Sequence, residues 1–294
     1  MKYAYYPGCS LMESAVEFDQ ATRAMLDRLE VEIEEIPDWT CCGASAVESV
    51  SQPLGRALPA RNLALAERHL PGLDILMPCA ACYLNHLKLT RQATGPVVRE
   101  VNRLLADEEL AYTSKGGRVR HLLDVLARDV GPEAIKARVA RELAGLVVAP
   151  YYGCQVLRPY PVFDDPEHPR SMEPIIEAIG ATVHPWRRGN ACCGASLMAT
   201  HKDAALASVA AILRAAAGAD VIVTVCSMCQ MNLDAYQAQA LGHGASAVTV
   251  LYLPQLVGLA LGLSPREVLM EKNLAITPVF TSKLEQTGAA RAVS

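Results

Sequence analysis

The chemistry of this chain is concentrated in its cysteines. The sequence of 294 residues contains ten of them, in two sets of five that follow one order: a single cysteine, then Cys-Cys-Gly-Ala-Ser, then Cys-x-x-Cys. The first set is Cys9, Cys41, Cys42, Cys79 and Cys82, and the second set is Cys154, Cys192, Cys193, Cys226 and Cys229. Packing alone does not explain a five-thiol pattern that occurs twice. The pattern predicts two metal sites with all ten cysteines as ligands.

Five thiols per site favour an iron–sulfur group. A structural zinc ion takes four tetrahedral ligands, often from two Cys-x-x-Cys pairs, and adjacent cysteines do not easily bind one tetrahedral ion. Ordinary ferredoxin clusters use four cysteines, commonly in short runs. A surplus thiolate beside a vicinal pair suits a polynuclear cluster in which one sulfur bridges two irons. Zinc and a metal-free redox dithiol remain the alternatives at this point.

Residues beside the cysteines are candidates for a supporting role. Gly43 and Gly194 lack a Cβ, so the chain can turn sharply there and bring backbone amides close to sulfur. A helix expected after each Cys-Cys-Gly would direct its positive N-terminal end at the site and lower the pKa of the thiols. A tyrosine pair precedes the single cysteine in both halves. From these pairs, Tyr6 and Tyr152 are candidates for hydrogen bonds to sulfur, with strand packing as the alternative.

The repeat extends beyond the cysteines. Residues 3–9 correspond to 147–154, residues 41–45 to 192–196, and residues 74–82 to 220–229, with offsets of about 145 to 151 residues. Short β-rich runs alternate with helical runs in each half, which predicts an α/β fold with one parallel sheet per half. Each cysteine group follows a predicted strand. The carboxyl ends of the strands would therefore bring five thiols to one edge of one sheet.

The individual elements are predicted from hydrophobic periodicity. Apolar residues spaced by three and four predict a helix over 15–29. We expect strands at 31–36, 75–78, 181–186 and 221–225, and a strand followed by a helix at both 97–105 and 248–263. The chain is divided into a first repeat (1–106), a charged helical connection (107–145), a second repeat (146–277) and a polar tail (278–294) that is expected to fray.

Composition excludes several classes of protein. The net charge of −4 does not predict binding to nucleic acid or to an anionic membrane. The N-terminal residues lack the apolar region of a secretory signal. The longest apolar run near the C-terminus, residues 251–263, has 13 residues, whereas a membrane span needs roughly 20. We therefore expect a cytoplasmic protein with no transmembrane segment, in which the thiols stay reduced.

The paired Cys-Cys-Gly-Ala-Ser and Cys-x-x-Cys motifs, together with residues 253–263, resemble the CCG-domain family, in particular the B-type subunit of heterodisulfide reductase. The resemblance covers nearly the whole chain. It implies that each five-cysteine set carries one noncubane [4Fe–4S] cluster, and that the two halves are related by a pseudo-twofold axis with the clusters facing each other. It also implies that Cys9, Cys41, Cys42, Cys154, Cys192 and Cys193 take part in catalysis through the clusters.

The resemblance further implies a reaction and partners. The family cleaves, or forms, a disulfide bound between the two clusters, each cluster handling one sulfur and one electron. Electrons pass through an iron–sulfur subunit with cubane clusters, similar to the family's C-type subunit, and a flavin subunit, similar to its A-type subunit. The composition, rich in Ala, Arg and Pro, favours the bacterial sulfur-oxidation type, whose substrate is sulfur on a lipoate-carrying protein. An electron-relay subunit without its own substrate and a zinc-stabilised scaffold are the alternatives.

Overall fold

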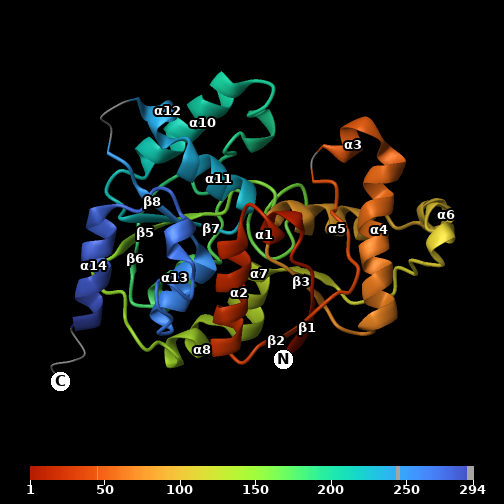
Figure 1. Ribbon diagram of the computed structural model, residues 1–294, viewed down its shortest axis with the longest axis horizontal. Helices are drawn as coiled ribbons and strands as arrows, with labels where there is room; N and C mark the ends of the chain where they lie inside the picture. Colours follow the sequence, from red (N-terminus) through yellow and green to blue (C-terminus); the bar gives the residue numbers. More distant parts are fainter. Residues whose placement is uncertain (45, 243–245, 290–294) are drawn as a thin grey trace. The chain divides into compact units, whose positions relative to one another are not determined.

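The chain forms two compact units in the computed structural model, which describes residues 1–44, 46–242 and 246–289. One unit contains Met1–Val16 together with Glu30–Leu122, and the other contains Glu17–Leu29 together with the chain from Leu123 onward. Among the described residues, no helix combines the length and the apolar character needed to cross a bilayer. Each unit is built around one sheet, and the course of the chain can be followed in Figure 1.

The first unit contains a parallel sheet of four strands. The strands are β1 (Lys2–Tyr5), β2 (Glu32–Glu35), β3 (Ile75–Met77) and β4 (Val119–His121), in the spatial order β2-β1-β3-β4. Its helical elements are α1 (Cys9–Met12), α3 (Val47–Val50), α4 (Gln52–His69), α5 (Ala80–Gln92), α6 (Gly95–Leu104) and the 3-10 turn η1 (Ala106–Glu108). Strand β1 lies inside the sheet, where Ala4 pairs with Glu34 on one side and with Ile75 on the other.

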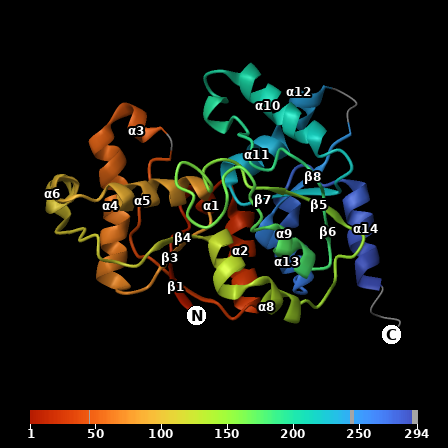
Figure 2. The same cartoon turned by 180° about the vertical axis from the view of Figure 1, so that it is seen from behind.

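The second unit repeats this sheet. Its strands are β5 (Val147–Tyr151), β6 (Thr182–Val183), β7 (Val221–Thr224) and β8 (Thr249–Tyr252), in the order β6-β5-β7-β8 and all parallel (Figure 2). Its helical elements are α2 (Val16–Arg28), α7 (Leu122–Asp124), the π-helix η2 (Val125–Val130), α8 (Pro132–Ala137), α9 (Glu173–Ala178), η3 (Ala195–Leu197), α10 (Lys202–Ala215), α11 (Ser227–Ala235), α12 (Gln237–Leu241), α13 (Leu253–Ala260), η4 (Met270–Lys272) and α14 (Pro278–Ala289).

The parallel sheets of both halves match the expectation from sequence. Strands β7 and β8 are buried along their whole length, as expected for strands that are covered on both faces and read as continuous apolar runs. The edge strands β8 and β2 differ, because β8 is fully buried whereas β2 (Glu-Ile-Glu-Glu) is largely exposed. The predicted α/β fold, with a parallel sheet in each half and cysteine groups after the strands, is confirmed.

Helix α2 follows β1 in the chain, yet it belongs to the second unit. Its buried residues include Phe18, Ala21, Thr22, Met25 and Leu26, a spacing of three and four that places them on one helical face. The ring of Phe18 is stacked on that of Tyr252, with centroids 4.1 Å apart and planes 9° from parallel. Both rings are essentially inaccessible to solvent. The helix therefore contributes to the core of the unit that carries the second set of cysteines.

Three elements differ from the predictions. Residues Gly95–Leu104 form a helix without a preceding strand, and the fourth strand of the first sheet is β4, within the predicted helical connection. Strand β4 is only three residues long and contains Arg120 and His121, so no apolar run marks it, although all three residues are buried. The tail was expected to fray, but Pro278–Ala289 form helix α14, which buries Phe280.

Replacing the stacked ring on α2 should destabilise the protein measurably. A Phe→Ala change in a packed core costs about 3–5 kcal/mol, so we expect Phe18→Ala to lower the melting temperature by roughly 5–10 °C. Val50 is 88% exposed, and Val50→Ala is the matched surface control, with a change within about 0.5 kcal/mol. Equal melting temperatures of the two variants would contradict the placement of Phe18 in the core.

Candidate metal centre

Each cysteine group lies in a loop that leaves the carboxyl end of a strand. In the first half, Cys9 follows β1, Cys41 and Cys42 follow β2, and Cys79 follows β3. These three strands are neighbours in the sheet. Because parallel strands end at the same edge, their loops meet there. In the second half, β5, β6 and β7 are neighbours in the same way and lead to Cys154, to Cys192 with Cys193, and to Cys226.

The sulfurs of the first half come into contact across the loops that carry them. The Sγ atoms of Cys9 and Cys41 are 3.4 Å apart, and those of Cys42 and Cys82 are 3.6 Å apart. Interaction with Cys42 raises the pKa of Cys41, and interactions with Cys42 and Cys79 raise the pKa of Cys82. Cysteines that are 32 and 40 positions apart in sequence are therefore brought into sulfur–sulfur contact.

The second half repeats the central contacts. The Sγ atoms of Cys193 and Cys229 are 3.5 Å apart, which corresponds to the contact of Cys42 with Cys82. Interaction with Cys154 lowers the pKa of Cys192, and interactions with Cys193 and Cys226 raise the pKa of Cys229. All ten cysteines are free thiols. Among the described residues, no three Cys, His, Asp or Glu side chains are arranged as the ligands of a single metal ion.

Each set of sulfurs has an inner and an outer part. Cys42, Cys79 and Cys82 are buried in the first half, as are Cys193, Cys226 and Cys229 in the second. By contrast, the single cysteine and the first member of the vicinal pair lie nearer solvent: Cys9, Cys41 and Cys192 are exposed, and Cys154 is half-buried. A group held by the inner sulfurs would be approached from the outer side in both halves.

In both halves the contacts between thiols lower the pKa of the second vicinal cysteine and raise the pKa of the last cysteine of Cys-x-x-Cys, whereas the first vicinal cysteine differs: the pKa of Cys41 is raised and that of Cys192 is lowered. Hydrogen bonds from Cys41 and Cys82 hold the pKa of Cys42 well below its usual value, and the same contact with Cys42 raises the pKa of Cys82. The hydrogen bond from Cys229 lowers the pKa of Cys193, and the hydrogen bond from Cys154 lowers the pKa of Cys192 to about 6. Thiolates, the form that binds metal, are thus favoured at defined positions.

The glycine of each Cys-Cys-Gly has a left-handed backbone that aims its amide at sulfur. Gly43 has φ +83° and Gly194 has φ +76°, which is a conformation that favours glycine. Their N–H groups donate to the Sγ of Cys41 at 3.4 Å and of Cys192 at 3.3 Å. A Cβ on Gly194 would lie 2.8 Å from the Cα of Ala205. The turn therefore needs glycine for its conformation and, at Gly194, for close packing.

The helices that begin at the site are those of the Cys-x-x-Cys motifs. The long helices expected after each Cys-Cys-Gly are α4 and α10, which begin at Gln52 and Lys202, and the short elements α3, of four residues, and η3, of three, lie between them and the glycines. Cys79 is instead the N-cap of α5, which has 13 residues, and Cys226 is the N-cap of α11, which has nine. The positive ends of these helices are therefore next to Cys79 and Cys226, rather than next to the vicinal pair.

The tyrosine that corresponds to Tyr6 is Tyr151 and not Tyr152. The hydroxyl of Tyr6 donates to the carbonyl of Thr40 at 2.7 Å, and that of Tyr151 donates to the carbonyl of Ala191 at 2.7 Å. Both carbonyls belong to the residue before the vicinal cysteines. Burial, followed by the nearby cysteines, raises the pKa of both phenols. Tyr6 and Tyr152 were the candidates for hydrogen bonds to sulfur, but the structure has their hydroxyls donating to the Thr40 carbonyl and to the Glu173 carboxylate.

Tyr152 has a different environment. Its hydroxyl donates to the Glu173 carboxylate and accepts a hydrogen bond from the Met172 amide at 2.8 Å. Tyr152 also lines a cavity of about 810 Å³ with Trp186 and Asn190. The offset of one residue was visible in the sequence, because Tyr6 and Tyr151 both stand three positions before the single cysteine, whereas Tyr152 stands two before it.

An asparagine after each Cys-x-x-Cys was missed in the sequence. Asn85 on α5 donates through Nδ2 to the carbonyls of Cys42 (3.1 Å) and Ala44 (2.6 Å). Asn232 on α11 donates in the same way to the carbonyl of Cys193 at 3.0 Å. Each asparagine thus ties the loop of the vicinal cysteines to the helix of the Cys-x-x-Cys motif. The signal was available, because Cys-x-x-Cys-x-x-Asn occurs in both halves.

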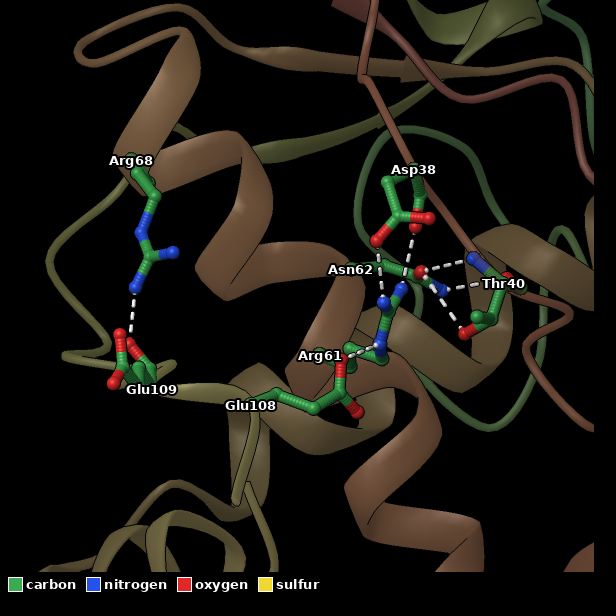
Figure 3. Close-up of polar contacts among 7 residues, drawn as sticks. All are labelled: Asp38, Thr40, Arg61, Asn62, Arg68, Glu108 and Glu109. Carbon is green, nitrogen blue, oxygen red and sulfur yellow. Dashed lines mark hydrogen bonds and ion pairs between the residues drawn. The ribbon is translucent and has the colours of Figure 1, made fainter. Parts of the chain in front are cut away.

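The loop that leads to Cys41 is also held by helix α4. Arg61 forms ion pairs with Asp38 and Glu108, with N–O distances of 2.6 Å each (Figure 3). The next residue, Asn62, pairs with the backbone of Thr40 through both halves of its amide. Consecutive residues of one helix thus fix the position of the segment 38–40 immediately before the vicinal cysteines.

Comparison with known proteins agrees with this repeat. The family model described as CCG, cysteine-rich domain, matches the chain twice, over residues 3–86 and 148–234. The two matches contain all ten cysteines. In the fold comparison, a hypothetical protein from Helicobacter pylori has a TM-score of 0.74 at 14% identity, and the match covers 95% of this chain and 52% of that one. That likeness concerns the fold.

Curated relatives match along almost the whole chain. The 8-methylmenaquinol:fumarate reductase membrane anchor subunit of Wolinella succinogenes is 35% identical over 279 residues, which is 93% of this chain and 96% of that one. A protein of Archaeoglobus profundus, named as similar to the B-type subunit of heterodisulfide reductase, is 30% identical, with 95% of each chain covered. The B-type subunit of the ferredoxin:CoB-CoM heterodisulfide reductase of Methanosarcina mazei is 29% identical, with 98% of each covered. With two complete copies of the domain, the chain belongs to the cysteine-rich CCG-domain family.

Proposed function

We propose that this chain is the catalytic subunit of a heterodisulfide reductase-like complex and that each half holds one noncubane [4Fe–4S] cluster. The observation that carries the proposal is the set of five thiols in each half, with inner sulfurs buried and outer sulfurs nearer solvent. Five thiols in each half exceed the four ligands of a zinc site. The likeness to the two B-type proteins of heterodisulfide reductases supports the same assignment.

The space around the inner sulfurs supports a bulky inorganic group. A Cβ on Gly8 would lie 2.7 Å from the Sγ of Cys82, and a Cβ on Gly153 would lie 3.0 Å from the Sγ of Cys229. Both glycines stand directly before the single cysteine of their half. The absence of a side chain at these positions keeps the inner sulfur accessible from the loop that carries the outer one.

In this proposal, the residues of the chain perform three tasks. The cysteine thiolates would bind the clusters, the amides of Gly43 and Gly194 would donate hydrogen bonds to ligand sulfur, and Asn85 and Asn232 would hold the vicinal loops in place. When bound, each cluster would supply one electron at one substrate sulfur. Reduction of a disulfide to two thiols consumes two electrons and two protons, which accounts for a duplicated site.

The substrate is proposed to be a disulfide or lipoate-bound sulfur. The proposed partners are an iron–sulfur subunit with cubane clusters and a flavin subunit.

A second candidate function is supported by the relative at 35% identity, whose name places it in a quinol:fumarate reductase. In that case the two clusters would relay electrons and bind no sulfur substrate. Reactivity with disulfides distinguishes the two candidates.

Cysteine variants combined with a turnover assay test the proposal. We expect the anaerobically purified protein to reduce a small disulfide with a viologen as the electron donor. Cys42→Ala and Cys193→Ala should each remove about half of the bound iron and lower turnover at least tenfold, because each substrate sulfur needs its own cluster. Full iron content in Cys42→Ala would refute the ligand assignment. Correct iron content without disulfide turnover in the wild-type protein would favour electron relay.

Substitution of the glycine before Cys9 tests the fit of the group without removing a ligand. Gly8→Ala and Gly72→Ala both place alanine at a left-handed φ, +79° and +81°, at similar backbone cost, but a Cβ at Gly72 meets nothing within 4 Å. We expect Gly8→Ala to lose the iron of the first site and Gly72→Ala to retain it. Iron content is measured per chain in both variants. Equal loss in both would show that backbone strain, and not the space beside Cys82, is the cause.

A further inference from the structure

A fully buried amide on helix α4 has all of its hydrogen-bonding capacity used. The side chain of Asn62 is inaccessible to solvent. Its Oδ1 accepts from the Thr40 amide at 2.8 Å and from the Thr40 hydroxyl at 3.4 Å, and its Nδ2 donates to the Thr40 carbonyl at 2.9 Å (Figure 3). The remaining Nδ2 contact is with the Nε2 of His86, at 3.3 Å. A buried polar group satisfied in this way fixes its partners in one arrangement.

The partner of Asn62 is an equally buried imidazole. His86 lies on α5, four residues after Cys82, and is inaccessible to solvent. Its Nδ1 is 2.7 Å from the Cys82 carbonyl, which can only accept, so Nδ1 carries the proton. Nε2 is then the acceptor for Asn62. The ring also packs against Tyr6, with centroids 4.7 Å apart, and Tyr6 itself donates to the carbonyl of Thr40.

These contacts connect two of the three cysteine groups through buried hydrogen bonds. The path runs from the Cys82 carbonyl through His86 and Asn62 to the backbone of Thr40, the residue before Cys41. Through Asn62 on α4, this path connects α5, the helix of the Cys-x-x-Cys motif, to the loop that carries Cys41 and Cys42. The same two segments carry Cys42 and Cys82, whose sulfurs are 3.6 Å apart.

Among the described residues, the second half has no equivalent pair. The position four residues after Cys229 is Leu233, which is fully buried. The buried residues of α10, the helix between the vicinal pair and β7, are alanine, valine, isoleucine and leucine alone. Tyr151 keeps its bond to the carbonyl of Ala191. The two halves therefore share the cysteines, the glycine turn, the tyrosine and the asparagine on the Cys-x-x-Cys helix, and differ in the pair formed by Asn62 and His86.

We propose that Asn62 and His86 are positioning residues for the first site only, and that they make the two metal sites unequal in affinity and reduction potential. This inference rests on the proposed function, because it requires that both halves bind clusters. Hydrogen-bonded residues behind metal ligands typically change metal affinity by about 10–100-fold when they are removed. In the first site this support includes a polar chain from α4, whereas position 233 and the buried face of α10 offer the second site only apolar side chains.

Variants that keep only one of the two metal sites serve as single-site parents, in which the effect of Asn62 and His86 on each site can be measured separately. Cys193→Ala is the parent that keeps the first site, and Cys42→Ala is the parent that keeps the second. We add His86→Leu, which introduces the residue present at position 233, or Asn62→Leu to each parent. Iron retained against a chelator and the midpoint potential of the remaining cluster are then measured without oxygen. In the first-site parent, we expect about 10–100-fold weaker retention and a shifted potential. In the second-site parent, both quantities should be unchanged.

A matched control separates positioning from general destabilisation. Asn102 on α6 pairs with the backbone of Tyr112 through both halves of its amide, at 2.9 and 3.1 Å, so it holds a segment other than the cysteine loops. Asn102→Leu should lower the melting temperature of the metal-free protein without changing iron retention or potential.

The double variant Asn62→Leu with His86→Leu removes the polar contact between the two side chains from both sides. We expect it to recover part of the melting temperature while its first site stays weak.

The outcomes are distinct. A first-site parent that binds no iron before any further change would refute the proposed function itself. Normal iron retention and potential in the first-site parent with His86→Leu would refute the inference and leave the proposed function standing. Equal weakening in both single-site parents would show that the pair supports the fold in general, which also contradicts a role specific to the first site.

Discussion

Holding five thiols against one another at the edge of a sheet is the constraint on which the rest of each half depends. Burial disfavours a charged thiolate, and neighbouring thiolates repel each other. The fold offsets both effects by bringing the loops together and by placing hydrogen-bond donors and positive helix ends beside the sulfurs. Three adjacent parallel strands deliver the loops to one edge, and helices α5 and α11 begin at Cys79 and Cys226. The amides of Gly43 and Gly194 donate to sulfur.

The cysteine spacing and strand pattern predicted most of this arrangement. Apolar runs such as Val221–Thr224 are buried on both faces, so they mark their strands clearly. The spacing of the motifs then placed each cysteine group after a strand end, which the structure confirms. Strand β4 escaped prediction because it is short and contains charged residues, whose burial depends on neighbours distant in sequence. The same applies to α14, which is anchored in part by the burial of Phe280 in its first turn.

The supporting residues were predictable only in part. The repeat of Asn85 and Asn232 and the correspondence of Tyr6 with Tyr151 were present in the aligned halves, although Tyr152 of the same tyrosine pair was chosen as the candidate. Asn62 could not have been found in this way, because it has no counterpart in the second half and its partner Thr40 lies 22 residues away. A residue of this kind is recognised from burial and hydrogen bonding alone. The membership of α2 in the second unit is likewise a property of tertiary packing.

Duplication followed by divergence explains how the two halves compare. Both halves keep the thiols, the left-handed glycine that donates to sulfur, and the Cys-x-x-Cys helix with the asparagine that holds the vicinal loop. The features that hold these parts from outside differ. The first half uses polar contacts from α4, including Arg61 and Asn62. In the second half, Asn190, two residues before the vicinal pair, is tied instead to the backbone of Pro166 and Glu167.

The central claim is that each half holds a polynuclear iron–sulfur group with its five thiols. The most direct measurement is the content of iron, acid-labile sulfide and zinc per chain in protein purified without oxygen. The account predicts about eight irons and about eight sulfides per chain, with little zinc. Stoichiometric zinc without sulfide would contradict it and identify the chain as a metalloprotein in which the cysteines serve only to stabilise the fold.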